Sequence, residues 1–272
     1  MPAEPRRPRL ARVLVTNDDG IDAPGLAVAE TIAAGLADEV WTVAPACDQS
    51  GRAQAITVRE PVEVVAHGAR RYSVTGTPAD CVLLAMAHWL ADTPPDLVIA
   101  GVNRGANISD TIVYSGTIGA ALAAAHLGLG AVALSQAFRG PAAEADFQPA
   151  RDYGGDVIAG LLADPSHAAG AWSVNFPAAR DPRPIQGIGW ARGATGAPVR
   201  PRAERVSGPG ERFQLAFSRS ASPVDAPDSD VAVLRSRRIS VMPLTNDRCD
   251  TAVFASATNR RDSRLDKIFT AR

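Results

Sequence analysis

Three short polar segments in the first half of the chain carry oxygen-bearing side chains of the kind that bind divalent cations. They are residues 17–20, 48–51 and 103–107, and the first contains two adjacent carboxylates. Two carboxylates this close disfavour each other's charged forms unless a positive charge lies between them. Mg²⁺ and Mn²⁺ prefer carboxylate, hydroxyl and amide oxygens. We therefore expect one divalent cation, Mg²⁺ or Mn²⁺, held by Asp18, Asp19, Ser50 and Asn103.

An ordinary turn is the competing interpretation of residues 17–20, because Asn, Asp and Gly all favour turns. Taken alone, the segment supports both interpretations equally. In open α/β sheets, however, ligands bind beyond the carboxyl ends of the strands. Each of the three polar segments follows an expected strand, so they should converge at one edge of a sheet. That convergence favours the metal site.

Ser115, Gly116 and Thr117 indicate a second kind of chemistry, because they directly precede an expected helix. Backbone N–H groups at a helix N-terminus bind anions, phosphate above all. Gly116 permits close approach of the backbone, and the two hydroxyls can add donors. Helix capping by Ser or Thr is the simpler interpretation of this segment alone, but beside a metal site an anion site is favoured. The segment is not a P-loop, since no Gly-Lys-Ser/Thr follows.

Other reactive side chains are less well supported. The four histidines lie outside the polar segments and lack ligand spacing. Cys47 is near the second segment, but the sequence places no histidine beside it, and no serine lies in a G-x-S-x-G elbow. Arg52 and Arg104 could clamp a phosphate. Solvated loop arginine is an equally good interpretation of both.

The elements that must position these residues form an α/β pattern. Residues 10–16 form a short apolar run typical of a buried parallel strand, Pro24 opens a helix over residues 25–37, and residues 39–44 form a second strand. This order predicts a doubly wound, mostly parallel sheet. Further along, we expect a hairpin with arms at 57–65 and 70–75, followed by a helix that is capped by Thr77 and Asp80 and runs to about residue 90. A strand at 96–100, a loop at 101–116, a helix at 117–127 and a strand at 131–135 are then expected.

After residue 138 the pattern weakens. Residues 139–150 read as a linker, followed by a helix at 153–162 and strands at 172–176, 185–190, 212–217 and 238–242. We therefore expect a disordered lead-in over residues 1–9, a metal- and phosphate-binding core over 10–138, and the remainder of the same domain with an irregular C-terminal extension over 139–272.

Composition limits the remaining function classes. The 272 residues are 46% apolar and carry a formal net charge of −1, so no general field attracts nucleic acid or membrane. The uncharged stretch 111–138 is interrupted by Gly and polar residues and divides into a helix and a strand, which argues against a membrane span. Three scattered cysteines suggest no disulfide framework, and the Pro- and Arg-rich start is unlike a signal peptide, so we expect a cytoplasmic protein.

Five sequence blocks, in order over about 120 residues, resemble the SurE family of survival-protein nucleotidases. The blocks are VTNDDGIDAPGL (15–26), VAPACDQSG (43–51), GTPADCV (76–82), AGVNRGANISD (100–110) and YSGTIGAA (114–121), with a weaker block at 229–245. The resemblance implies a Rossmann-like, three-layer αβα core and a divalent-metal phosphatase acting on nucleoside 5′- and often 3′-monophosphates. It also implies a homodimer or homotetramer formed through the hairpin and the C-terminal extension.

Residue by residue, the resemblance implies that Asp18 and Asp19 are the metal-binding carboxylates, Ser50 the hydroxyl ligand and Asn103 the amide ligand. Positions around the phosphate are matched by Asn107, Ser115, Gly116 and Thr117. We expect Asp18 or Asp19 also to accept a proton from the attacking water, and Asn107 to stabilise charge on the phosphoryl oxygens.

This chain departs from the family pattern at Cys47, where a longer polar side chain is usual, and at Arg237-Arg238, where Gly-Tyr is common. Residues 190–230 match only loosely. These departures concern substrate preference and oligomer contacts. Two alternatives therefore stay open: a broad phosphatase or exopolyphosphatase, and a catalytically silent nucleotide-binding regulator.

Overall fold

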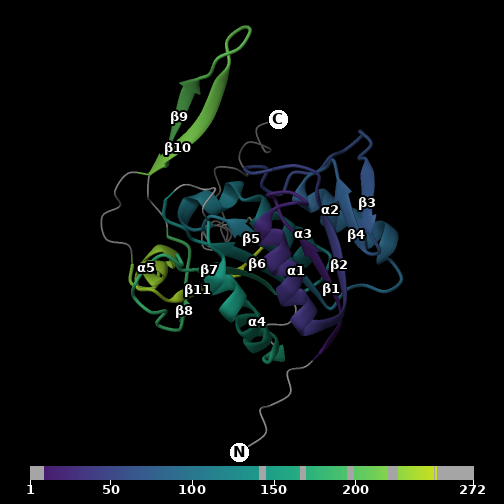
Figure 1. The fold of residues 1–272 in the computed structure, drawn as a ribbon, viewed down its shortest axis with the longest axis horizontal. Coiled ribbons are helices and arrows are strands. Elements are labelled where there is room, and N and C mark those ends of the chain that lie inside the picture. Colours follow the sequence, from purple (N-terminus) through teal and green to yellow (C-terminus); the bar gives the residue numbers. More distant parts are fainter. Residues whose placement is uncertain are drawn as a thin grey trace, which may run out of the picture.

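The fold is built on one mixed, mostly parallel sheet of nine strands in the order β3-β4-β2-β1-β5-β6-β7-β11-β8 (Figure 1). This computed structural model describes residues 9–140, 145–165, 170–194, 199–219, 226–247 and 249. The sheet contains β1 (Leu10–Thr16), β2 (Ala37–Pro45), β3 (Val64–Gly68), β4 (Arg71–Val74), β5 (Leu97–Arg104), β6 (Ala131–Gln136), β7 (Ala171–Phe176), β8 (Ile188–Trp190) and β11 (Ile239–Leu244). The predicted α/β class with a mostly parallel sheet is confirmed.

Helices cover both faces of this sheet. They are α1 (Pro24–Leu36), α2 (Pro78–Leu84), α3 (Gly116–His126), α4 (Gln148–Leu162) and the short α5 (Asp230–Arg235). Figure 1 shows α1 and α4 side by side on one face, where both contribute to one buried cluster, while α2 and α3 contribute to a second. In β1, Val13 and Val15 point into the first cluster and Leu14 into the second. A strand buried on both faces explains the continuous apolar run in the sequence.

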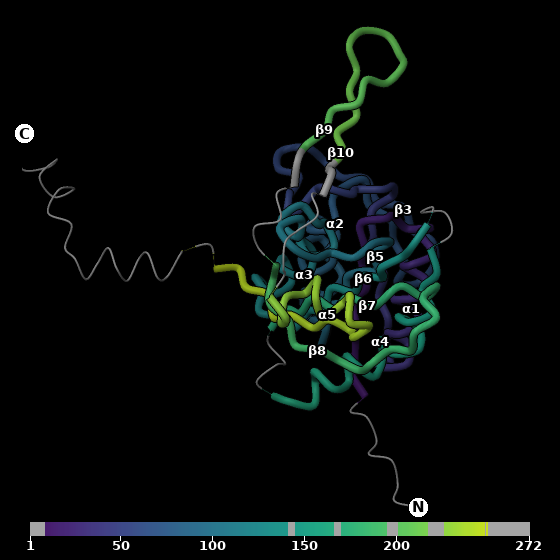
Figure 2. The backbone as a smooth tube through the Cα atoms, turned by 90° about the vertical axis from the view of Figure 1, so that its left-hand side faces the viewer, coloured from purple at the N-terminus to yellow at the C-terminus, as the bar shows by residue number. Residues whose placement is uncertain are grey.

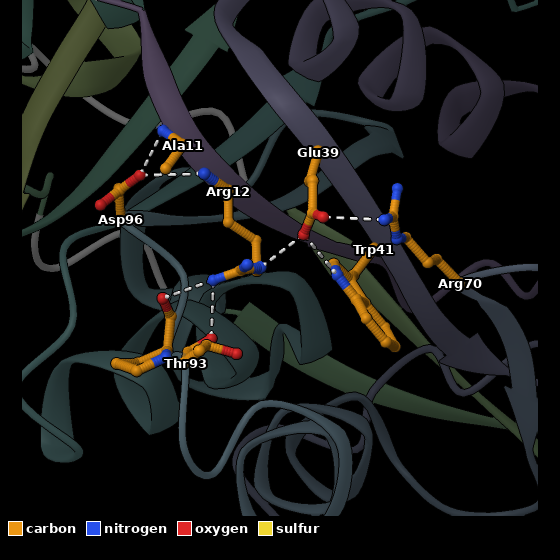
Figure 3. Close-up of polar contacts among 8 residues, drawn as sticks. Ala11, Arg12, Glu39, Trp41, Arg70, Thr93 and Asp96 are labelled. Carbon is orange, nitrogen blue, oxygen red and sulfur yellow. Dashed lines mark hydrogen bonds and ion pairs between the residues drawn. The ribbon is translucent and has the colours of Figure 1, made fainter.

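The edge of the sheet at which β1 begins is fixed by a polar network (Figure 3). Asp96 accepts hydrogen bonds from the N–H groups of Ala11 and Arg12, at 2.6 and 2.9 Å. The Arg12 guanidinium donates to Glu39 at 2.7 Å, and Arg70 donates to the other oxygen of Glu39 at 2.7 Å. These contacts join β1, β2 and the start of β5 at this edge. The carboxyl ends of the same strands lie at the opposite edge, which is where ligands bind in sheets of this kind.

Several expected boundaries were wrong. The first hairpin arm begins at Val64 and not at residue 57, because Thr57 instead donates to Asp80 at the start of α2, from its N–H at 2.8 Å and its hydroxyl at 2.6 Å. The loop expected at 101–116 contains the end of β5 and a 3₁₀ helix at Ser109–Tyr114. The linker expected at 139–150 contains the start of α4, since Pro149 lies in its first turn, where proline is tolerated.

The second half of the chain is more regular than expected. Its strands β7, β11 and β8 complete the main sheet, and β11 pairs antiparallel with β7. Two elements were not predicted, α5 and β9 (Val199–Arg205). Strand β9 pairs antiparallel with β10 (Phe213–Arg219), and both views show this hairpin standing away from the body (Figures 1 and 2).

Two expectations concern parts of the chain outside this description. The lead-in lies outside the described residues except for Arg9, and so does most of the C-terminal extension beyond residue 247. Within the described part, no helix has both the length and the apolar character needed to cross a membrane. The uncharged stretch 111–138 indeed divides into helical turns, α3 and β6.

Candidate active site

The first polar segment and the start of α3 meet directly at the carboxyl end of β1. The Thr117 hydroxyl donates a hydrogen bond to Oδ1 of Asp18 at 2.6 Å, although 99 positions separate the two residues in sequence. Asp18 is only 3% exposed. A Cβ atom placed on Gly116 would lie 2.8 Å from the Cβ of Asp18, so only glycine allows this approach. The anion at the N-terminus of α3 in this structure is therefore the Asp18 carboxylate.

Burial sets the protonation chemistry of the two adjacent carboxylates. It raises the pKa of Asp18 to about 6; the charge of Asp19 adds to this increase, and the hydrogen bond from Thr117 opposes it. Burial also raises the pKa of Asp19, against a hydrogen bond from the Arg104 backbone and the Arg104 charge. Burial therefore makes the charged form of each carboxylate less favourable than it is in water. A cation beside them would relieve that cost.

Arg104 joins the first polar segment to the second. Its N–H donates to Oδ2 of Asp19 at 3.0 Å, and its guanidinium lies 3.8 Å from carboxylate oxygens of both Asp19 and Asp48. The backbone N–H of Gln49 donates to the carbonyl oxygen of Asp18 at 2.7 Å. Ser50 is exposed, and its N–H donates to Asp48 at 2.7 Å, which leaves its hydroxyl without a hydrogen bond to any described residue. The two loops thus form one edge, as predicted.

The side chain of Asn103 is held by a hydrogen bond to the backbone. Its side-chain Nδ2 donates to the carbonyl oxygen of Gly105 at 2.9 Å, so its amide oxygen is turned away from that contact. Because β5 extends to Arg104, Asn103 lies on a hydrogen-bonded strand, paired with Ser135 of β6. The position is more rigid than the loop that we expected.

Asn107 is held by the ends of two strands. Its side-chain Nδ2 donates to the Ser135 hydroxyl at 2.9 Å, and its N–H donates to Oδ1 of Asn175 at 2.9 Å. An amide nitrogen carries two hydrogens, so one remains for a ligand. Sequence analysis missed Ser135 and Asn175; the signal was a polar residue near the end of each of two buried strands.

The start of α3 combines capping with a free donor. The Ser115 hydroxyl accepts from the N–H of Ile118 at 3.1 Å, so the capping interpretation is confirmed for Ser115. The Thr117 hydroxyl and N–H both act on Asp18. Within the described residues, the Gly116 N–H has no hydrogen-bond partner. Of the three expected phosphate contacts, Gly116 is therefore the most directly available donor.

The donor chemistry at this edge fits a hard divalent cation. No group of three or more His, Cys, Asp or Glu side chains gathers in the described part of the chain. The expected ligand set contains only two such residues, Asp18 and Asp19, and its other members supply a hydroxyl and an amide oxygen. Oxygen-only sets of this kind suit Mg²⁺ or Mn²⁺, not Zn²⁺.

A cavity of about 270 Å³ opens beside Asp19. Arg104 and Cys47 supply polar groups to its wall, while Ile21, Pro24 and Phe147 are among its apolar lining. Its lining therefore combines charged and polar groups with apolar side chains.

Known proteins place this constellation in a family. The description "Survival protein SurE" matches residues 13–197, which is more than half of the chain and includes every residue of the site. The chain belongs to the SurE family. That finding confirms the resemblance carried by the five sequence blocks.

Relatives of this SurE-family chain agree with the match. A protein of Azorhizobium caulinodans named 5′-nucleotidase SurE is 42% identical over 265 residues, covering 96% of this chain and all of the relative. One of Burkholderia lata named 5′-nucleotidase SurE 1 is 43% identical over 247 residues, covering 89% of this chain and 93% of the relative. The crystal structure of the SurE protein from Aquifex aeolicus superposes with a TM-score of 0.76 at 28% identity, covering 92% of this chain and all of that one.

Proposed function

We propose that this SurE-family chain is a 5′-nucleotidase that hydrolyses nucleoside 5′-monophosphates, and also 3′-monophosphates, to nucleoside and phosphate with the help of Mg²⁺ or Mn²⁺. The single observation that carries the proposal is the packing of the buried Asp18-Asp19 pair against the N-terminus of α3. This packing supports a cation site at the carboxylate pair and a phosphate site at the neighbouring helix terminus. The relatives named 5′-nucleotidase support the choice of substrate.

The cation would be held by Asp18, Asp19, Ser50 and Asn103. When bound, it supplies Lewis-acid polarisation of a phosphoryl oxygen and lowers the pKa of a water molecule. The raised pKa values of both carboxylates support this assignment, since a cation favours their charged forms. The Thr117 hydroxyl orients Asp18 for the same purpose.

The phosphate would be bound by the chain's own donors. The Gly116 N–H lies at the positive end of α3, and the remaining hydrogen of the Asn107 amide adds a donor from the neighbouring loop. Donors fixed in this way stabilise the charge that develops on the phosphoryl oxygens during in-line attack. Ser135 and Asn175 act as positioning residues, because they hold Asn107 in place.

Asp19 is the better placed of the two carboxylates to accept a proton from the attacking water. Oδ1 of Asp18 is taken by Thr117, and Asp18 is buried. Asp19 lines the cavity of about 270 Å³, and its Oδ1 has Arg104 at 3.8 Å as a loose partner. The apolar side chains in the lining of that cavity, Pro24 and Phe147 among them, would contact the nucleoside.

Metal dependence is tested with p-nitrophenyl phosphate, assayed with added Mg²⁺ or Mn²⁺ and again after chelation. We expect turnover only with the cation; metal-independent turnover contradicts the proposed site, and the absence of turnover in both conditions indicates the silent regulator. A panel of AMP, 3′-AMP, a sugar phosphate and polyphosphate then separates a nucleotidase from a broad phosphatase or exopolyphosphatase. A preference of at least tenfold in kcat/KM for the nucleotides supports the proposal.

Location and assembly belong to the same proposal. Three free cysteines, two of them exposed, support a reducing, cytoplasmic setting. The hairpin predicted to take part in a homodimer or homotetramer is the one formed by β3 and β4; we propose that the projecting β9–β10 hairpin also takes part, since it exposes Phe213 by 53% and Leu215 by 74%. The division into a core over residues 10–138 and a remainder over 139–272 is also retained as a proposal.

A further inference from the structure

A second cavity, of about 200 Å³, lies beyond the ends of β6 and β7. Four arginines but only one carboxylate belong to its described lining: Arg139, Arg183, Arg235, Arg237 and Asp181. We call it the arginine cavity. Four arginines against one carboxylate make this lining predominantly positive.

The single carboxylate is shared. Arg183 donates to both oxygens of Asp181, from Nε at 3.0 Å and from a terminal nitrogen at 2.8 Å. A terminal nitrogen of Arg139 lies 3.2 Å from one of the same oxygens. The hydrogen bonds from Arg183 hold the pKa of Asp181 well below its usual range, and the charge of Arg237 contributes. One negative charge thus serves three arginines.

Arg237 is the least compensated of these cations. It is only 6% exposed, and its guanidinium donates to the carbonyl oxygens of Arg183 at 3.0 Å and Ala178 at 2.6 Å. No carboxylate among the described residues forms an ion pair with it. Asp181, the carboxylate near it, is shared with Arg183 and Arg139, so the charge of Arg237 is only partly compensated. A guanidinium has five N–H donors, of which these contacts use two. The cavity therefore offers both charge and free donors to an anion.

Asp230, a second buried acid, is next in sequence to Val231 of the cavity lining but does not neutralise the arginine cavity. Asp230 begins α5, and its carboxylate accepts from the N–H groups of Ser109, Ala194 and Val231 at 2.8 to 3.0 Å. The Asp230 carboxylate is therefore committed to backbone donors. The contact with Ser109 also joins α5 to the loop that carries Asn107. Helix α5 contributes Arg235 to the cavity lining.

The arginine cavity is a direct neighbour of the proposed phosphate contacts. Ser135 on β6 holds the Asn107 side chain, and Phe138, three residues further on, lines the cavity, which limits their separation along the chain to about 10 Å. Ile108, the residue after Asn107, also lines it. Atom Cε1 of Phe138 lies 3.8 Å from where a Cβ on Gly105 would be, so Phe138 is close to Gly105, two residues before Asn107.

We propose that the arginine cavity is a phosphate-binding subsite beside the active site. Guanidinium groups match phosphate through paired N–H donors, and four arginines belong to the lining of this one cavity. Two sources share this chemistry: a second phosphate group on the substrate, which rests on the proposed nucleotidase function, and free inorganic phosphate, which does not.

The test uses the full chain with Arg139→Gln, because this side chain is 66% exposed and its removal leaves the Arg183–Asp181 pair intact. Arg70→Gln is the matched control: Arg70 is also a partly exposed arginine, 46%, with one acidic partner, Glu39, but it lies next to β4 near the other end of the sheet. Arg139→Lys is the second variant, because lysine keeps the positive charge but lacks the paired N–H donors of a guanidinium group. Thermal unfolding confirms that all three fold.

Inorganic phosphate binding is measured by ³¹P NMR in the presence of chelator, which removes the contribution of the cation. The ratio of kcat/KM for adenosine 3′,5′-bisphosphate to that for AMP is measured with cation. In Arg139→Gln we expect a loss of about tenfold in phosphate affinity, in the ratio, or in both. We expect a smaller loss in Arg139→Lys and none in Arg70→Gln.

A fall in the ratio assigns the subsite to a second substrate phosphate, and a fall in phosphate affinity alone assigns it to free phosphate. If neither quantity differs between Arg139→Gln and Arg70→Gln, or if both variants lose equally, the proposal is overturned. Should wild-type protein fail to hydrolyse AMP, the proposed function fails, while phosphate binding in chelator still decides the fate of the subsite.

Discussion

Replacing Thr117 with valine removes the hydroxyl that donates to Asp18 and leaves the shape of the side chain nearly unchanged. The lost hydrogen bond is short, 2.6 Å, and its acceptor is a carboxylate that is 3% exposed. Hydrogen bonds to charged groups contribute roughly 1.5–3 kcal/mol, and one pKa unit corresponds to about 1.4 kcal/mol. The bond lowers the pKa of Asp18. Its loss should therefore raise that pKa by about one to two units.

The raised pKa makes protons better competitors for the cation. In the wild-type protein, with Asp18 near pKa 6, the carboxylate is mostly charged at pH 7 before metal binds. In Thr117→Val, with the pKa of Asp18 higher by roughly one to two units, about half to one-tenth of the molecules would have a charged Asp18 carboxylate at pH 7. We expect the apparent affinity for Mn²⁺ to fall by about two- to tenfold at pH 7 and to recover to the wild-type value above about pH 9.

The assay is a Mn²⁺ titration of turnover and of binding, repeated from pH 5.5 to 9. Thr117→Ser keeps the hydroxyl and should reproduce the wild-type pH dependence, which makes it the control for disturbance of the helix start. If Thr117→Val shows the same pH dependence of Mn²⁺ affinity as wild type, the Thr117–Asp18 bond does not control the metal site, and the reasoning is refuted.

Two further predictions follow from the same packing. In chelator, the free energy of unfolding of the metal-free protein should fall as pH rises from about 4 through 6, because the folded state holds a proton on Asp18 that the unfolded state has lost. The total decrease is roughly 3 kcal/mol. Urea unfolding of Asp18→Asn should show no such decrease. Gly116→Ala places a Cβ 2.8 Å from that of Asp18 and should abolish metal-supported turnover. Gly35→Ala in α1 is the control, because nothing lies within 4 Å of the new atom. It should stabilise the protein by about 0.5–1 kcal/mol in thermal unfolding without changing turnover. If the two alanine variants behave equally, the close approach at Gly116 has no importance for the site.

Sequence analysis was most successful where a residue's role follows from its place at the end of a strand. Asp18-Asp19 and residues 48–51 both follow buried apolar runs, and parallel strands bring such positions to one edge of a sheet. The bond between Asp18 and Thr117 could not be anticipated, because the distance across the sheet from β1 to α3 depends on packing. The capping interpretation of Ser115 is confirmed, and Thr117 donates to the Asp18 carboxylate, while phosphate binding at this helix start stays a prediction.

The missed elements have a different cause. Strand β5 continues through Gly101 and Asn103, residue types that favour loops, because β6 offers Ser135 and Gln136 as pairing partners. Similarly, the short α5 is capped by Ser229 and fixed by the contacts of Asp230 with distant backbone amides. Tertiary partners override local preference in both places, and they are not visible in a single sequence.

The central claim, that the carboxylate pair at the end of β1 supports metal-dependent hydrolysis, is tested most directly by comparing Asp19→Asn with Asp22→Asn. Asp22 lines the same cavity but is exposed and outside the ligand set. With AMP and saturating Mn²⁺, we predict that kcat falls by at least 100-fold in Asp19→Asn and stays within about twofold of wild type in Asp22→Asn. Full activity in Asp19→Asn, or an equal loss in both variants, would contradict the account.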